Sequence, residues 1–422
     1  MPVTASYTSP LAESLAADVL ERFQRYVRID TQSALDQSTT PSTQKQFDLA
    51  KLLLAELQEL GLEGVELDEQ CYVTATLPGN VAGAPAIGVL AHLDVSYDAP
   101  STGVEPIVHR NYDGGVIELP RGGTVLDPAA MPDLSHKVGH DLVSASGDTL
   151  LGADDKAGVS AIMTAVKHLL ANPGAPRCTL KIAFTPDEEI GSLAAGLDLE
   201  KFAARCAYTI DGSEIGELSY ESFSAKHAIV TIEGVDVHPG YAAGKMVSAL
   251  RLAAEVLAAL PSDRLTPATS SGRQGYIHAT ELTGTPSQAR IRVILRDFDD
   301  QQLTVHEELL KETVAQVVDA DPRASATVEV KRDYHNMKVE IEKDPEVIAA
   351  AEAAYRAEGI EPVSHPIRGG TDGSALSLRG LPTPNIFDGG YDYHSVREWA
   401  SVQEMAAAAA VIVRLAEVWS SR

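Results

Sequence analysis

The chain has 422 residues, 44% of them hydrophobic and 22% charged, which is typical of a globular protein with a substantial core and two or three domains. Against 34 Lys and Arg stand 60 Asp and Glu, a formal net charge of −26 at pH 7 that disfavours nucleic acid and anionic membranes as partners, because their phosphates would be repelled. Three cysteines without a CxxC pair, no signal-peptide pattern and no apolar run near the ~20 residues of a membrane helix together predict a cytoplasmic protein.

The first half of the chain alternates between helical and strand patterns. Apolar residues recur at helical spacing in several segments, and short apolar runs bounded by turn residues indicate strands. Such alternation is typical of an α/β fold whose sheet has helices on both faces. The predicted elements are a loose leader over 1–12, helices at 14–29, 42–60 and 157–171, strands at 72–77, 86–91 and 179–185, and loops with short strands over 96–150.

The middle of the chain follows a different order. Its patterns predict strand, helix, two strands, helix and strand, which is the order of a ferredoxin-like α+β unit. A complete unit of this kind inside an α/β chain indicates an inserted domain over 224–334. We therefore predict a main domain from 1–223 and 335–422, with a mixed, mostly parallel sheet flanked by helices. The expected elements of the insert are strands at 227–233, 276–282, 288–296 and 326–332 and helices at 245–260 and 301–318, and a last helix is expected at 402–420.

Five separated segments carry side chains of the kind that bind metal ions, mostly beside the end of a predicted strand. In "GVLAHLDV", His92 and Asp94 share one face of a strand, where the Asp can accept the second ring N–H of the His. In "FTPDEEIGS", three consecutive acids follow a strand, and a cation would compensate their repulsion. The candidate residues are His92, Asp94, Asp154, Asp155, Asp187, Glu188, Glu189, Asp211 and His394.

Each segment taken alone also has an ordinary structural explanation. Asp154 and Asp155 can favour the start of a helix through its dipole, Asp211 with the following Gly is a turn signal, and His394 can be an exposed loop residue. Together, two histidines and several carboxylates form the mixed N/O ligand set that suits Zn²⁺ and also Mn²⁺ or Co²⁺. A paired metal site needs one bridging carboxylate and a separate carboxylate that is free to act as a base.

In this order, the segments resemble those of the M20 metallopeptidases, and within that family the tripeptide aminopeptidases. The resemblance covers nearly the whole chain. It rests on the segments "GVLAHLDVS", "LLGADDKAG", "FTPDEEIG", "IDGSEIGEL", "GVDVHPGYA", "LRDFD", "IRGGTDGS" and "GGYDYH".

The resemblance implies removal of the N-terminal residue from tripeptides by a di-zinc-activated water and a glutamate general base. It implies two Zn²⁺ per subunit, with Mn²⁺ or Co²⁺ as alternatives. The implied roles are His92 and Asp211 on one ion, Glu189 and His394 on the other, Asp154 bridging both, Glu188 as the base, and Asp94 orienting His92.

The inserted domain is implied to be a lid. His238, Arg296 and Arg368 are implied to contact the short peptide substrate, and an arginine paired with the terminal carboxylate would limit peptide length. Lids in this family often pair, so a homodimer is a further expectation. The sequence departs from the family pattern after Asp94, in HLDV, and after His394, in YDYHSVREW, and neither departure changes a proposed ligand.

Two other readings stay open. The same scaffold serves carboxypeptidases, dipeptidases and deacylases of N-acyl amino acids. A metal-dependent binding protein without catalysis would also keep the fold, but its signature would be the loss of Glu188 or of a ligand, and every position is intact.

Overall fold

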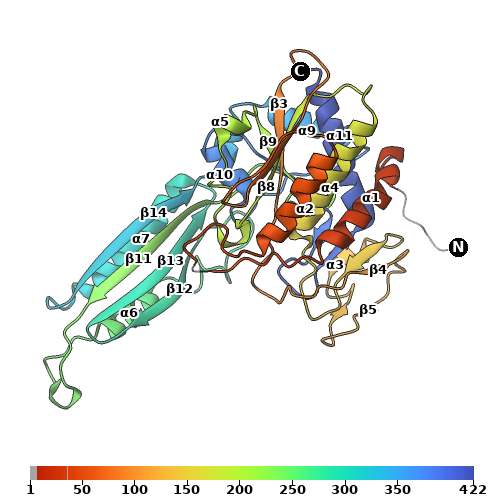
Figure 1. Cartoon of the computed structure of the whole chain (residues 1–422). Coiled ribbons are helices and arrows are strands. Elements are labelled where there is room, and N and C mark those ends of the chain that lie inside the picture. The colour runs from red at the N-terminus through yellow and green to blue at the C-terminus, as the bar shows by residue number, and fades with distance from the viewer. Residues whose placement is uncertain (1–6, 36) are drawn as a thin grey trace. The chain divides into compact units, whose positions relative to one another are not determined.

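The computed structural model describes residues 7–35 and 37–422, so the first six residues of the predicted leader lie outside the described part. The chain divides into two compact units (Figure 1). Unit 1 comprises Met1–Tyr220, Glu340–His365 and Thr371–Arg422, and unit 2 comprises Glu221–Val339 and Pro366–Gly370. Within the described residues, no helix is both long enough and apolar enough to span a membrane.

Unit 1 is built on a seven-stranded mixed sheet of order β1-β2-β8-β3-β9-β15-β10. Its central strands are parallel: β3 pairs with both β8 and β9, and β9 pairs with β15. The margins are antiparallel, through β1 with β2, β2 with β8, and β10 with β15. The strands are β1 Glu63–Leu67, β2 Val73–Leu77, β3 Ala86–His92, β8 Thr179–Thr185, β9 Ala207–Thr209, β10 Leu218–Ser219 and β15 Asn385–Ile386.

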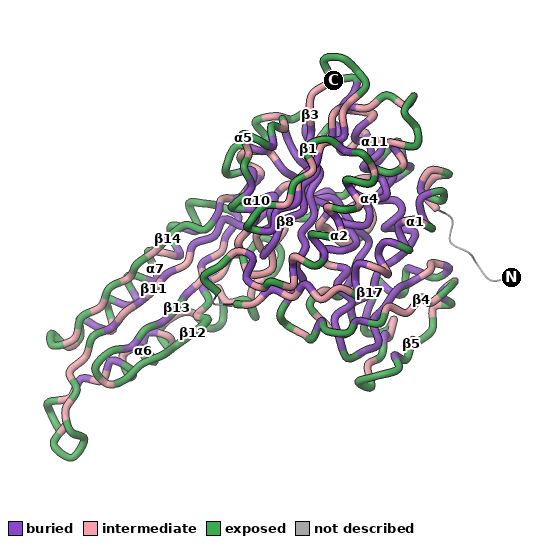
Figure 2. Tube along the Cα trace, viewed as in Figure 1, coloured by how far each residue is buried: buried purple, intermediate pink, exposed green. Residues whose placement is uncertain are grey.

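Helices cover both faces of this sheet, because its central strands are apolar on both sides. On one face, α2 (Gln46–Glu59), α4 (Ala153–Ala171), α9 (Glu346–Ala357) and α11 (Val402–Trp419) contribute to one large core with the strands. On the other face, the short helices α5 (Leu199–Phe202) and α10 (Asp372–Leu378) pack on Leu90 and Ala183. Figure 2 shows the buried residues concentrated in β3, β8, α4 and α11. The fold class predicted for the main domain is therefore confirmed.

The helix α1 (Pro10–Tyr26) begins earlier than the sequence pattern predicted. Ser9 accepts a hydrogen bond from the backbone of Ala12, and Pro10 occupies the first helical turn, so a cap and a proline start the helix inside the expected leader. The helix α2 begins later than predicted, at Gln46, because residues 42–45 precede it in a separate turn.

Two smaller sheets complete unit 1, and most of their strands come from the loop-rich stretch 96–150. One is antiparallel with the order β16-β17-β7-β4, and the other pairs β5 with β6. The strands are β4 Ile107–His109, β5 Ile117–Glu118, β6 Val125–Leu126, β7 Leu142–Ser144, β16 Gly390–Tyr391 and β17 Trp399–Ser401, and short helical turns are α3 Pro132–Ser135 and η1 Glu188–Ile190. The short helix α8 (Lys338–Ile341) includes the last residues of Glu221–Val339 in unit 2 and the first of Glu340–His365 in unit 1.

Unit 2 has the β-α-β-β-α-β order that the sequence predicted. Its four strands form an antiparallel sheet of order β12-β13-β11-β14, on which α6 and α7 pack through apolar side chains such as Val256, Leu303 and Leu310. Along β13, buried residues alternate with more exposed ones, and along most of β14, half-buried residues alternate with exposed ones, as expected for a sheet covered on one face (Figure 2). The elements are β11 Ser224–Glu233, η2 Pro239–Tyr241, α6 Ala249–Ala259, β12 Tyr276–Gly284, β13 Gln288–Asp297, α7 Asp300–Val318 and β14 Ser325–Tyr334.

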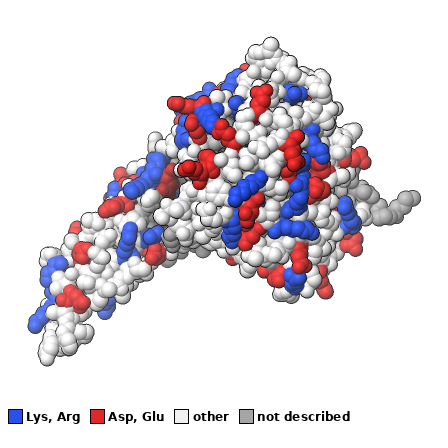
Figure 3. All heavy atoms as spheres, in the orientation of Figure 1, with Lys and Arg blue, Asp and Glu red and all other residues white. Residues whose placement is uncertain are grey.

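On the face drawn in Figure 3, the acidic residues do not form one continuous acidic surface. Basic and acidic side chains are interspersed there over unit 1 and over unit 2. Several form ion pairs, such as Arg205 with Asp344 at 3.0 Å and Arg121 with Glu105 at 2.8 Å. Several acidic residues lie instead in a partly buried cluster inside unit 1.

Candidate metal centre

The acidic cluster lies where three parallel strands of the main sheet end. The strand β3 ends at His92, β8 ends at Thr185 just before the turn that carries Glu188 and Glu189, and β9 ends at Thr209 just before Asp211. Because β3 is parallel to both β8 and β9, these carboxyl ends meet at one edge of the sheet. Ligand sites in open α/β sheets form at this edge.

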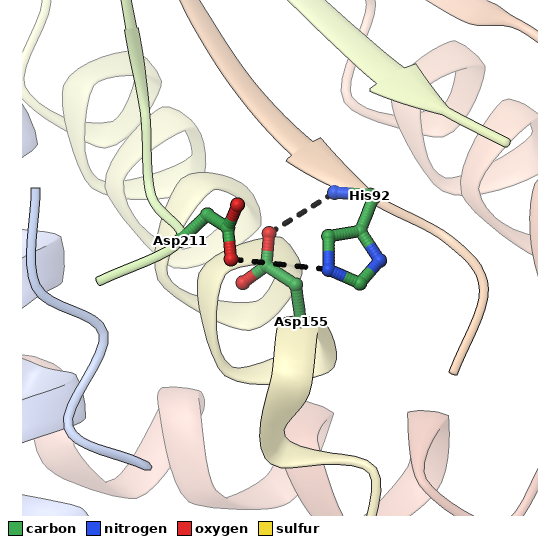
Figure 4. A group of neighbouring side chains, drawn as sticks. All are labelled: His92, Asp155 and Asp211. Carbon is green, nitrogen blue, oxygen red and sulfur yellow. Dashed lines mark hydrogen bonds and ion pairs between the residues drawn. The ribbon is translucent and has the colours of Figure 1, made fainter. Parts of the chain in front are cut away.

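The first group of close ligand atoms consists of His92, Asp155 and Asp211. One ligand atom from each lies within 4.8 Å of the others. Figure 4 shows Asp211 pointing toward the ring of His92, with 3.9 Å between Asp211 Oδ1 and His92 Nε2. Asp155 is engaged differently: its Oδ2 accepts the backbone N–H of His92 at 3.0 Å, and its Oδ1 accepts that of Gly158 at 3.2 Å. Both oxygens of Asp155 therefore accept hydrogen bonds from backbone N–H groups.

The second group consists of His92, Asp154 and Glu189, whose ligand atoms also lie within 4.8 Å of one another. Asp154 faces two histidines: its Oδ1 is 2.8 Å from His92 Nε2, and its Oδ2 is 3.3 Å from His394 Nε2. His394 Nε2 is also 2.8 Å from Glu189 Oε2. Asp154 is thus the carboxylate placed between the two histidines.

Local backbone geometry presents these side chains. Asp154 and Asp155 have non-helical dihedral angles inside the first turn of α4, which separates the directions of their carboxylates. His394 has a φ of 59°, in the left-handed region, and lies in the loop between β16 and β17. The two strands that flank this loop belong to a smaller sheet and not to the main sheet, so the strand pattern of the sequence does not indicate where the loop lies.

Asp94 belongs to neither group, although it lies directly beside His92. Its Oδ1 accepts the backbone N–H of Glu188 at 3.0 Å, and its Oδ2 accepts that of Glu189 at 3.2 Å. His92 Nδ1 is 3.0 Å from the Asp94 backbone oxygen and 3.4 Å from Asp94 Oδ1. Asp94 thus holds the turn with both glutamates beside the strand that carries His92.

The same turn is anchored from its other side by Asp187, which is fully buried and has a φ of 59°. Its Oδ2 accepts the backbone N–H of Ser42, and its Oδ1 accepts the Ser42 hydroxyl and the Gln46 side-chain amide, each at 2.6 Å. These contacts explain why α2 begins only at Gln46.

Glu188 also lies outside both groups of ligand atoms. It is half-buried, and its backbone is fixed by Asp94. Burial, and after it the nearby carboxylate of Asp211, raises the pKa of Glu188 well above its ordinary value. A partly buried carboxylate that has a raised affinity for a proton and belongs to neither group of ligand atoms is suited to proton transfer.

The charges at the site indicate that cations belong there. Burial, followed by interactions that include neighbouring carboxylates, raises the pKa of Asp155 and Asp211 well above the ordinary value and that of Glu189 to about 7. Glu189 Oε1 is buried and has no hydrogen-bond partner, while the whole side chain is 3% exposed. Two histidines and several clustered carboxylates are a donor set for Zn²⁺, Mn²⁺ or Co²⁺. The residues therefore fit a metal centre.

Two acids near the site were not identified from the sequence. Asp388 follows β15, which is parallel to β9; it is buried and accepts the Tyr393 hydroxyl at 2.6 Å. Asp372 is the first residue of α10 and accepts the Thr185 hydroxyl at 2.5 Å. For Asp388 a signal was present: an acid followed by glycine directly after a short apolar strand, as at Asp211.

The predicted substrate residues His238, Arg296 and Arg368 all lie in unit 2, which is described by itself. His238 is exposed, and its Nδ1 accepts the backbone N–H of Gly240 at 3.1 Å. Arg296 donates to the backbone oxygens of Lys226 and Leu295 at 3.1 and 3.0 Å. Arg368 donates to those of Gly272 and Gln274 at 2.5 and 3.0 Å. Their role toward a peptide stays a prediction.

Comparison with known proteins identifies a family. The model of peptidase family M20/M25/M40 matches residues 150–418. Peptidase T of Geobacillus thermodenitrificans is 42% identical over 407 residues, which are 96% of this chain and 99% of that protein. Peptidase T of Vibrio cholerae is 45% identical over 401 residues, which are 95% and 98% of the two chains.

Solved structures show the same fold. Aminopeptidase PepT from Bacillus cereus superposes with a TM-score of 0.75 at 23% identity, covering 96% of this chain and 98% of that one. A Bacillus subtilis protein described as a dinuclear metal-binding peptidase from the M20 family superposes with a TM-score of 0.65 at 14% identity, covering 96% and 98%.

Proposed function

Because this chain belongs to peptidase family M20/M25/M40, we propose that it is a metal-dependent aminopeptidase that removes the N-terminal residue from tripeptides. The observation that carries the proposal is the carboxylate of Asp154, whose two oxygens face His92 and His394 at 2.8 and 3.3 Å. The substrate class comes from the family resemblance of the sequence segments, and relatives named peptidase T are similar over nearly their whole length.

In this proposal two Zn²⁺ ions bind per subunit, with Mn²⁺ or Co²⁺ as alternatives. We favour Asp154 over Asp155 as the bridging ligand, because both oxygens of Asp155 already accept backbone N–H groups. When bound, two such ions polarise a carbonyl group and lower the pKa of water toward neutrality. The proposed ligands are His92 and Asp211 for one ion, Glu189 and His394 for the other, and Asp154 for both.

Glu188 is the proposed general base. One of its carboxylate oxygens takes a proton from the attacking water, and the same carboxyl group then gives that proton to the nitrogen of the leaving amine. Glu188 suits this role because it lies outside both groups of ligand atoms while Asp94 fixes its backbone N–H at 3.0 Å. Asp94 has a supporting role: it orients His92 through Nδ1 and holds the turn with Glu188 in place.

Unit 2, which includes the predicted insert 224–334, is the proposed lid. His238 is proposed to stabilise the developing oxyanion, and Arg296 or Arg368 to pair with the C-terminal carboxylate of the peptide. A fixed distance between that arginine and the metal centre would favour tripeptides over longer chains. A cytoplasmic setting and a homodimer stay predictions from the sequence and the family resemblance.

A substrate panel tests this proposal. Tripeptides with free N-termini should be hydrolysed to an amino acid and a dipeptide, a chelator should abolish the reaction, and added Zn²⁺, Mn²⁺ or Co²⁺ should restore it. Tripeptides with an acetylated N-terminus, dipeptides and tetrapeptides serve as matched comparisons. Preferred hydrolysis of N-acyl amino acids or dipeptides would reassign the enzyme within the family. Metal binding without hydrolysis of any of these compounds would instead indicate a binding protein.

A further inference from the structure

The side chain of Glu398 links the two segments that present Asp154 and His394. Glu398 is buried, with 2% of its surface exposed. Its Oε2 accepts the backbone N–H groups of Leu151 and Gly152, both at 2.8 Å, and its Oε1 accepts that of Asp154 at 3.1 Å. One carboxylate therefore accepts three backbone N–H groups within the four-residue segment 151–154 that ends in Asp154.

These donors depend on Glu398 because of the local backbone. Gly152 has a φ of 81°, and Asp154 has φ −79° and ψ 102°, so this segment is not a regular helical turn. Its N–H groups lack the carbonyl partners that residues inside a helix have. Leu151 and Gly152 are buried, where an N–H group without an acceptor is unfavourable. The carboxylate of Glu398 satisfies them and thereby fixes the direction in which Asp154 leaves the backbone.

At its other end, Glu398 belongs to the loop that carries His394. The backbone N–H of Glu398 donates to Ser395 O at 3.2 Å, which closes a turn directly after His394. The next residue, Trp399, is fully buried in β17 and pairs with Ser144 of β7. The pairing of Trp399 in the sheet therefore fixes the position of the Glu398 carboxylate. The backbone of Glu398 also closes the turn in the loop that carries His394.

Glu398 is not itself a candidate ligand. It belongs to neither group of close ligand atoms, and both of its oxygens are occupied by backbone donors. Its contacts nevertheless join residues that are far apart in the sequence and whose side chains meet at 3.3 Å, between His394 Nε2 and Asp154 Oδ2.

We propose that Glu398 is a positioning residue that sets the relative geometry of Asp154 and His394 before a metal ion binds. This inference rests on the proposed function, in which both residues are metal ligands. Residues that orient ligands in this way typically change metal affinity by about 10–100-fold when they are replaced.

The test compares Glu398→Gln with Glu404→Gln. In Glu398→Gln the carboxamide has only one acceptor oxygen. Its NH₂ group, which is a donor, then faces either the N–H of Asp154 or the N–H groups of Leu151 and Gly152, so that two donors oppose each other. Glu404 is a matched control because it is similarly buried, with 1% exposed, but accepts from the side chains of Lys137 and Tyr391 at 2.7 and 2.6 Å and from no backbone N–H of the segment with Asp154. Each full-length protein is stripped with a chelator and titrated with Co²⁺, and the visible absorption of bound Co²⁺ is recorded.

We expect wild type and Glu404→Gln to bind two Co²⁺ with the same affinity and spectrum. Glu398→Gln should bind Co²⁺ about 10–100-fold more weakly, with a shifted spectrum. Wild-type affinity and spectrum in Glu398→Gln would overturn the positioning role while leaving the proposed function intact. Failure of the wild type to bind two Co²⁺ would overturn both. If Glu398→Gln does not fold, Glu398→Asp replaces it: a side chain shorter by about 1.5 Å cannot reach both sets of donors, and unchanged binding there would refute the proposal.

Discussion

The anchor of the turn that carries Glu188 can be tested by two substitutions of Asp187. In Asp187→Ala, the backbone N–H and the hydroxyl of Ser42 and the side-chain amide of Gln46 each lose an acceptor at 2.6 Å. Each buried donor left without a partner costs about 1–3 kcal/mol, so the three together cost about 3–9 kcal/mol. Burial raises the pKa of Asp187, which shows that its charge is itself poorly solvated. Removing that charge offsets part of the loss, and we expect a net decrease of about 3 kcal/mol in the free energy of unfolding.

Asp187→Asn should be much milder. Asparagine tolerates the left-handed φ of 59° at this position better than alanine does. Its carbonyl oxygen can accept from Ser42 N–H, and its new NH₂ group can donate to Gln46 Oε1, which is buried and has no hydrogen-bond partner. We expect a loss of at most about 1 kcal/mol.

Urea unfolding followed by tryptophan fluorescence measures both variants. The two tryptophans, Trp399 and Trp419, are fully buried in unit 1, so their fluorescence reports on the unit that holds the turn. Asp187→Ala should also lower kcat, because the turn carries the proposed base. The control is Asp198→Ala, which removes a cap of α5 but no contact to the site, and should lower stability without changing kcat. Equal losses in Asp187→Ala and Asp187→Asn would refute this reasoning.

Four further outcomes are expected. Glu188→Gln should lower kcat by about 10²–10⁴-fold while plasma mass spectrometry still finds two metal ions per chain; a normal kcat would mean that another group is the base. Asp154→Ala should lose metal, since its oxygens face both His92 and His394, and full retention of both ions would contradict a bridging role. Chelation should lower the thermal unfolding midpoint, because the buried carboxylates lose their counter-charge, whereas an unchanged midpoint would indicate that the ions bind elsewhere. Burial, and after it Lys137, lowers the pKa of His140 to about 4. As the pH falls, this histidine is therefore protonated in the unfolded chain before it is protonated in the folded one. The free energy of unfolding should keep its full value above pH 6.5 and decrease as the pH drops toward 4. His140→Gln should reduce that decrease in urea titrations at pH 7 and 5, and an identical pH dependence would count against the assignment.

The sequence was sufficient to predict the fold class, because hydrophobic periodicity reports directly on strands and helices. The β-α-β-β-α-β order of the insert could be predicted from the sequence for the same reason. The start of α1 was predicted too late because the Ser9–Pro10 cap precedes the first apolar residue of the periodic pattern.

The arrangement of the site was only partly predictable. That acids follow strands β8 and β9 can be read from the sequence, but the adjacency of β3 to both strands depends on strand order, which local patterns do not contain. For the same reason local patterns did not separate Asp154, which faces two histidines, from Asp155, which accepts backbone N–H groups; only the family resemblance singled out Asp154. It also did not reveal that Asp94 holds the turn with both glutamates.

The contact between Asp154 and His394 also bears on the timing of activity during synthesis. The two residues are 394 − 154 = 240 positions apart in the chain. At about 5–20 residues per second, a ribosome needs roughly 12–48 s to add that length. During this interval the nascent chain already displays His92 and Asp154 but has no His394 to complete the pair. In the proposed enzyme, a growing chain or a product truncated before this loop could not cleave peptides, so hydrolysis would begin only after nearly the whole main domain has been made.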